Sequence, residues 1–122
     1  MVDKYYKIAK QVHEVERSYL LSIGKPAVSW EEAGKPRQDL RAKTVFLIID
    51  GCIPGPEKAH AAWRVAKMLE GWSYGEKENL QHKTHPYMTD YENLPKEHRI
   101  KDYILFNIIN ISKDVVQDDP KL

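Results

Sequence analysis

Side chains able to hold a planar, charged small molecule gather in two neighbouring stretches of this 122-residue chain. His60, Trp63 and Lys67 are spaced at i, i+3 and i+7, so they share one face of a helix. The stretch from 71 to 86, GWSYGEKENLQHKTHP, adds aromatic and basic residues in what looks like a loop. Aromatic rings can stack on a planar group, and an ammonium group attracts a negative charge. The two stretches therefore predict a site for a planar, anionic small molecule.

The same residue types also have purely structural uses, and the residues alone leave both interpretations open. Trp63 can be a core residue, and His60 can hydrogen-bond a nearby backbone carbonyl. The aromatic residues of the loop can anchor it to the helices. His85, whose backbone is restricted by Pro86, can likewise bond a backbone carbonyl within a fixed turn.

Composition excludes several functional classes. The 19 basic and 18 acidic residues give a net charge of +1, which provides no general attraction to nucleic acid or to an anionic membrane. The single cysteine, Cys52, excludes an internal disulfide and a multi-cysteine zinc site, and it suits a reducing compartment. The longest apolar run, VFLII at 45–49, is too short to span a bilayer, and the first ten residues resemble no signal peptide. We therefore expect a cytoplasmic protein without nucleic-acid or membrane partners.

Apolar periodicity predicts helices over 3–21, 57–70 and 96 to about 115. Residues 36–50 begin like a helix but end in β-branched residues that favour a strand. Because Gly51 is well placed to end a helix, we predict a helix there. Residues 72–94 lack periodicity yet carry enough aromatic side chains to fold. We expect a mainly α fold: a small helical domain of about four helices, with a long structured loop between the last two helices that has room for short β-strands.

Two helices show apolar faces that bear on packing. In the helix over 57–70, one face is distinct from that of His60 and consists of Ala59, Ala62, Ala66 and Leu69. In the last helix, the predicted inner stripe consists of Ile100, Ile104, Ile108 and Ile111, with Tyr103 and Val115 beside it and Leu105, Phe106 and Ile109 widening it.

The motifs of the second half are similar to those of a known family. The pattern E-x-x-H-x-x-W at 57–63, then Lys67, then GW-x-YG at 71–75, resembles the RyR domain, the module repeated in the cytoplasmic part of ryanodine receptor calcium channels. The likeness continues to about Ile109 through Lys83, His85, Pro86, Tyr91, Leu94, Pro95, Lys101 and Asp102. The first half resembles the stand-alone microbial form more loosely, through Ile8, Ala9, His13, Glu14, Arg17, Tyr19, Gly24 and Trp30. Two positions depart from the family pattern: Asn79 replaces a usual acidic residue, and Glu76 replaces a usual proline.

The resemblance implies a stand-alone, non-catalytic module of a bacterial or phage protein. It implies a single domain over 1–122, with a family core at about 57–111 and an N-terminal helical extension at about 3–50. Stand-alone members suggest a nucleotide-derived ligand of the adenine-nucleotide or ADP-ribose type. Joined to the residue patterns above, this predicts a ligand-binding set of His60, Trp63, Lys67, Trp72, Tyr74, Lys83, His85 and Tyr91.

Other functions are compatible with the sequence in different degrees. The alternative is a protein–protein interaction module, including a homo-oligomer, with aromatic surfaces at Tyr5 and Tyr6 or in the segment 87–91. We expect no enzymatic activity and no cofactor, because no nucleophile elbow, P-loop or dinucleotide-binding glycine pattern is present. His82, His85 and Glu78 are spaced to approach a metal, but we identify no fourth ligand for structural zinc.

Overall fold

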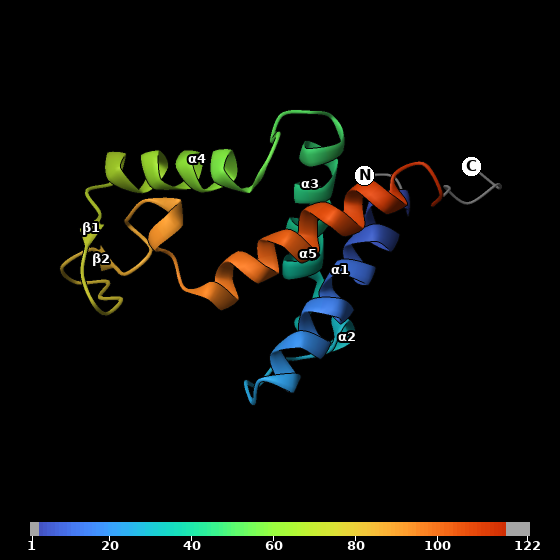
Figure 1. Cartoon of the computed structure of the whole chain (residues 1–122), viewed down its shortest axis with the longest axis horizontal. Coiled ribbons are helices and arrows are strands. Elements are labelled where there is room, and N and C mark those ends of the chain that lie inside the picture. The colour runs from blue at the N-terminus through green and yellow to red at the C-terminus, as the bar shows by residue number, and fades with distance from the viewer. Residues whose placement is uncertain (1–2, 117–122) are drawn as a thin grey trace.

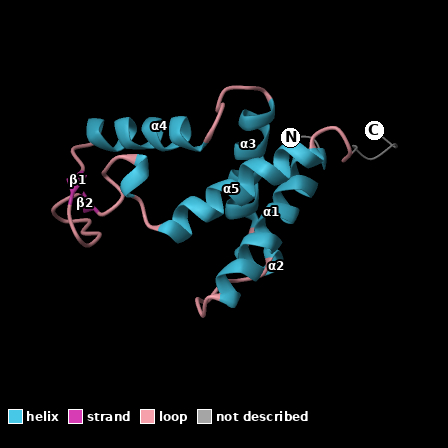
Figure 2. Ribbon diagram, in the orientation of Figure 1, coloured by secondary structure: helices cyan, strands magenta, loops and turns pink. Residues whose placement is uncertain are grey.

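The computed structural model describes residues 3–116, which fold into a mainly α structure (Figures 1 and 2). The α-helices of this part are α1 (Asp3–Ser22), α2 (Trp30–Ala33), α3 (Lys35–Ile49), α4 (Pro56–Leu69) and α5 (Lys96–Ser112). Between α4 and α5 lie the two-residue strands β1 (Ser73–Tyr74) and β2 (Thr84–His85) and the 3-10 helix η1 (Tyr91–Asn93). The predicted mainly α fold and its structured loop are confirmed. No helix within 3–116 combines the length and the apolar character needed to cross a membrane.

The main hydrophobic core lies where α1, α3 and α5 pack against one another. Its buried members are Ile8, Ala9 and Val12 of α1, Ala42 and Val45 of α3, and Ile109 of α5. In α1 and α3 these residues recur at three- or four-residue spacing, so each of these two helices turns one narrow apolar stripe toward the core.

Residues 36–50 are helical, as predicted, in spite of their β-branched end. Pro36 lies in the first turn, where its missing N–H leaves no intrahelical bond unmade. At the other end Gly51 has φ +83, and the N–H of Cys52 bonds Leu47 O at 2.9 Å. Burial of Ala42 and Val45, one turn apart, outweighs the weak local preference for a strand.

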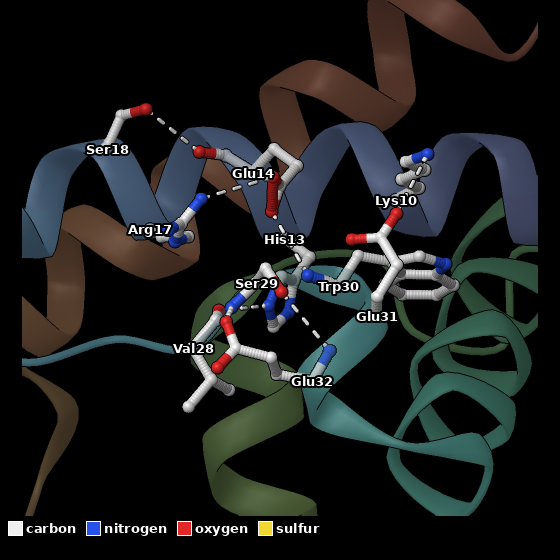
Figure 3. Close-up of polar contacts among 10 residues, drawn as sticks. All are labelled: Lys10, His13, Glu14, Arg17, Ser18, Val28, Ser29, Trp30, Glu31 and Glu32. Atoms are coloured by element: carbon white, nitrogen blue, oxygen red, sulfur yellow. Dashed lines mark hydrogen bonds and ion pairs between the residues drawn. The ribbon is translucent and has the colours of Figure 1, made fainter.

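The short helix α2 was absent from the sequence-based prediction, which placed no helix between residues 21 and 36. It begins with a capping box: Ser29 Oγ accepts the N–H of Glu32, and Glu32 Oε1 accepts the N–H of Ser29, both at 3.2 Å. The residues before it are held to α1, because His13 Nε2 donates to Val28 O at 2.8 Å (Figure 3). A four-residue helix has too little periodicity to be found from its sequence.

The inner face of α5 differs from the predicted isoleucine stripe. Ile109 is completely buried, whereas Ile111 is 72% exposed and Val115 is 73% exposed. Leu105 packs against the core beside Ile109, and Ser112 is buried where its hydroxyl donates to Gln11 Oε1 at 3.0 Å. The prediction of Ile111 as an inner residue is therefore wrong. The helix is apolar on several sides, so the positions of α1 and α3 decide which side is covered.

Helix α4 extends away from the three-helix bundle and packs against α5 and η1 (Figure 1). Its alanine-rich face is largely exposed, with Leu69 84% accessible, while His60 on the other face is buried. The loop over 72–94 covers that second face. β1 and β2 pair in parallel, with Ser73 opposite Thr84 and Tyr74 opposite His85. Met88, Tyr91 and Leu94 of the loop are buried, and the Tyr91 ring contacts the buried His60.

Candidate functional site

A cavity of about 350 Å³ lies between α4, the end of the loop and α5. Its lining residues are Pro56, Ala59, His60, Trp63, His85, Tyr87, His98 and Asp102. Most of these side chains are aromatic or imidazole rings, and one is a carboxylate. Three separate segments of the chain contribute them, so the cavity forms only when the loop packs between the two helices.

The α4 wall is built on a buried histidine. His60 Nε2 donates to Thr89 O at 2.7 Å, which fixes the ring and satisfies a carbonyl of the loop. The Trp63 indole stacks on this imidazole, with ring centroids 5.7 Å apart and planes 24° apart. His60 thus bonds a backbone carbonyl, as the structural interpretation expected, and both rings also face the cavity.

The β2 wall consists of His85 and the residues after it. The N–H of Tyr87 donates to His85 Nδ1 at 3.0 Å, so the neutral ring carries its proton on Nε2. That nitrogen lies 3.5 Å from Glu78 Oε1. The imidazole lies edge-on to Trp63 at 5.3 Å between centroids and edge-on to Tyr87 at 5.0 Å. His85 therefore joins the α4 wall to the rest of the loop.

Helix α5 supplies the titratable part of the cavity. His98 and Asp102 are one turn apart, with His98 Nε2 3.7 Å from Asp102 Oδ2, which is too long for a hydrogen bond. Burial raises the pKa of Asp102 to about 6. Burial, with the positive charge of Lys101, lowers the pKa of His98. At pH 7 and above the cavity thus presents a carboxylate beside a neutral imidazole.

Tyr91 lies behind this wall rather than on it. Its ring is buried and tilted against His60 at 6.0 Å between centroids. Its hydroxyl is also buried and has no hydrogen-bond partner of ordinary geometry within residues 3–116. Burial and the nearby Asp102 charge raise the pKa of this hydroxyl, so it stays protonated. Tyr91 therefore does not line the cavity itself but lies next to two residues that do, His60 and Asp102.

The remaining predicted site residues lie around the cavity but outside the set that lines it. Lys67 Nζ lies over the Trp72 ring, 5.1 Å from its centroid, and Trp72 is edge-on to His85 at 6.4 Å. Lys83 has φ +54 and donates from Nζ to Glu70 O at 2.7 Å, at the end of α4. Tyr74 is 59% exposed. The structure thus brings His60, Trp63 and His85 together, holds Trp72 and Tyr91 next to them, and directs Lys67 and Lys83 to other contacts.

Five lining residues were missing from the predicted set: Pro56, Ala59, Tyr87, His98 and Asp102. The four-residue spacing of His98 and Asp102 on a predicted helix is a signal for a shared face. That spacing does not tell which residues the face meets. Tyr87 follows Pro86 and carries no spacing signal of its own.

Asn79 stands where the RyR-domain pattern usually has an acidic residue. Its side chain accepts a hydrogen bond that a carboxylate could also accept. Its Oδ1 accepts the N–H of His82 at 3.0 Å, and its backbone pairs with Thr84 in both directions. An oxygen acceptor is all that this turn requires, and both Asn and Asp provide one.

The arrangement suits recognition of a planar group with N–H donors. Rings enclose it from α4 and the loop, and Asp102 offers oxygen acceptors. Cys52 lies elsewhere, exposed, and its hydrogen bond to Asp50 raises the pKa of the thiol. Within residues 3–116 no group of three or more His, Cys, Asp or Glu side chains is placed to hold a metal ion.

All eight lining residues fall within a segment that a family model recognises. The model of the RyR domain matches residues 56–108, from the start of α4 to the last third of α5. Comparison with curated proteins found no match. The predicted resemblance is thus confirmed for this segment: residues 56–108 match the RyR-domain family.

Proposed function

We propose that this RyR domain is a non-catalytic module that binds a nucleotide-derived ligand of the adenine-nucleotide or ADP-ribose type, with the base in the cavity between α4 and α5. The observation that carries the proposal is the combination of ring-lined walls with the single carboxylate of Asp102. A base stacked on an aromatic side chain gains roughly 1–3 kcal/mol. The exocyclic amine of adenine supplies the N–H donors that Asp102 accepts.

The size of the cavity decides which part of the ligand it holds. Its volume of about 350 Å³ lies at the low end of the range for small-molecule sites. This suits a base with part of its sugar. Phosphate groups then lie at the mouth, outside the reach of Lys83, which is bonded to Glu70 O. Affinity should therefore depend on the base more than on the number of phosphates.

The test is a calorimetric titration with adenosine, AMP and ADP-ribose, and with uridine as the control base. We expect binding of all three adenine compounds within about tenfold of one another and weaker binding of uridine. A ligand at 100 times its Kd should also add about 2.7 kcal/mol to the free energy of unfolding.

Variants locate the ligand. Trp63→Leu and Asp102→Asn should each weaken binding at least tenfold, whereas Lys83→Ala should leave the affinity within about twofold. Loss of binding in Lys83→Ala with normal binding in Trp63→Leu places the ligand on the outer surface of the loop and contradicts the proposal. So does the absence of binding by folded wild-type protein.

A protein-interaction role is the second candidate, because the outer face of α4 is apolar and uncovered by the described residues. Val65, Met68 and Leu69 are all more than half exposed there. A homo-oligomer or a partner protein covering this face is tested by the mass in solution as a function of concentration. Leu69→Glu should abolish any such association, and a constant monomer mass excludes the homo-oligomer.

A further inference from the structure

A second cavity, of about 250 Å³, lies outside the RyR domain, between α1, α3 and the segment 26–28. Three guanidinium groups line it: Arg17 from α1, and Arg37 and Arg41 from α3. The other lining residues are His13, the carboxylate Glu16, and an apolar group of Leu20, Pro26, Ala27 and Val28. The fold thus gathers three positive charges from two helices beside an apolar wall.

The acidic groups nearby engage only part of this positive charge. Arg41 Nη1 lies 3.1 Å from Glu16 Oε2. Arg17 Nη1 lies 3.6 Å from Glu14 Oε1 (Figure 3). Each pair uses one terminal nitrogen of a guanidinium group that has five N–H donors. Arg37 is exposed and has no ion pair or hydrogen bond within residues 3–116. Donors from all three arginines therefore stay available at one cavity.

Some buried polar atoms of the residues around the cavity also lack hydrogen-bond partners within the described part of the chain. His13, which lines it, is 5% exposed and spends Nε2 on Val28 O, while its Nδ1 is buried without a hydrogen-bond partner in the described part of the chain. Arg17 Nε is buried and unpartnered in the same way. Because native proteins satisfy nearly all buried polar groups, two such nitrogens beside one cavity point to a missing polar partner.

We propose that this cavity binds a small phosphate monoester, with the phosphate group held by Arg17, Arg37 and Arg41 and a short apolar group against Leu20, Pro26 and Val28. Guanidinium groups match the geometry of phosphate oxygens and bind them through paired hydrogen bonds. The volume is below that of typical drug-sized sites, which restricts the ligand to a small molecule.

The experiment uses the full chain at constant ionic strength, with propyl phosphate, inorganic phosphate and butyrate as probes. Affinity is measured by calorimetry, and the site is located by amide chemical-shift changes in NMR spectra. We expect propyl phosphate to bind at least fivefold more tightly than inorganic phosphate and more tightly than butyrate. Shift changes should concentrate in residues 13–20, 26–28 and 37–41. If propyl phosphate and inorganic phosphate bind with equal affinity, the cavity binds a free anion and the apolar part of the proposal is wrong. If butyrate binds as tightly as propyl phosphate, the choice of a phosphate group is wrong.

A matched pair of variants separates binding at this cavity from general charge screening. Arg37→Gln removes a cavity guanidinium that has no partner to lose, and Lys43→Gln removes the same charge from an exposed position of α3 outside the cavity. Arg37→Gln should weaken propyl phosphate at least fivefold, and Lys43→Gln less than twofold. Equal effects of the two variants, or shift changes confined to the α4–α5 cavity, overturn the proposal.

Discussion

The imidazole of His85 lies edge-on against the indole of Trp63, with their ring centroids 5.3 Å apart. Beyond it, the Tyr87 ring contacts both His85 and His98 of α5, at 5.0 and 4.6 Å between centroids. One continuous series of rings thus runs from α4 through the loop to α5. Because these rings are also the walls of the cavity, docking of the loop and formation of the site are the same structural event.

The first prediction concerns this connection. His85→Ala should undock the loop and lower the free energy of unfolding by about 2 kcal/mol, because it removes ring contacts on both sides. The control is His82→Ala, an exposed histidine of the same loop, which should change stability by less than about 0.5 kcal/mol. Urea denaturation followed by tryptophan fluorescence measures both. Equal effects would show that the ring series does not stabilise the domain.

A second prediction concerns the contact between the two short strands. A Cβ added at Gly75 would lie 2.5 Å from Thr84 Cβ, so Gly75→Ala must push β1 and β2 apart. We expect a loss of about 1–3 kcal/mol, typical of overpacking. Gly55→Ala is the matched control, since its nearest neighbour would be 3.7 Å away and its φ of −175 suits any residue. The idea fails if thermal unfolding shows the two variants to be equally stable.

The third prediction is a pH dependence from Asp102. Its pKa is raised from 3.8 in the unfolded chain to about 6 in the folded state, so the folded state binds the proton more tightly. Ionised Asp102 therefore lowers stability, an effect absent below pH 4, growing between pH 4 and 6 and constant above. Asp102→Asn should stabilise the protein relative to wild type by up to about 2 kcal/mol at pH 7, and this gain should decline toward pH 4. A difference that stays flat from pH 4 to 7 contradicts the raised pKa.

A fourth prediction tests which side of α5 faces the core. Ile109→Ala should cost about 2–5 kcal/mol, because the side chain is fully buried among α1 and α3. Ile111→Ala makes the same chemical change on a side chain that is 72% exposed, and it should cost less than about 0.5 kcal/mol. Chemical denaturation of both variants gives the comparison. A larger loss for Ile111 would restore the stripe expected from the sequence.

The sequence predicted part of the candidate site. His60, Trp63 and His85 were identified from helical spacing and from the composition of the loop, and the structure brings all three to one cavity. Lys67 and Lys83 carry the same local signals but turn to Trp72 and to Glu70 O. A basic side chain near an aromatic one in the sequence can line a ligand site or make an internal contact. Only the path of the loop decides between these two roles.

Local signals determined the longer helices of this protein, α1, α3, α4 and α5. Spacing at three and four residues, Pro36 and Pro56 in first turns, and left-handed glycines such as Gly51 and Gly71 act over a few residues, so the sequence alone contains them. The tertiary structure decided which side of each helix is covered. Helix α5 buries Ile109 and exposes Ile111. Helix α4 buries His60 and leaves most of its alanine-rich face exposed. Both helices carry apolar or aromatic residues on several sides, and burial is not directional. Which side of a helix is buried depends on how segments distant in the sequence pack against it. The sequence of that helix alone does not contain this information.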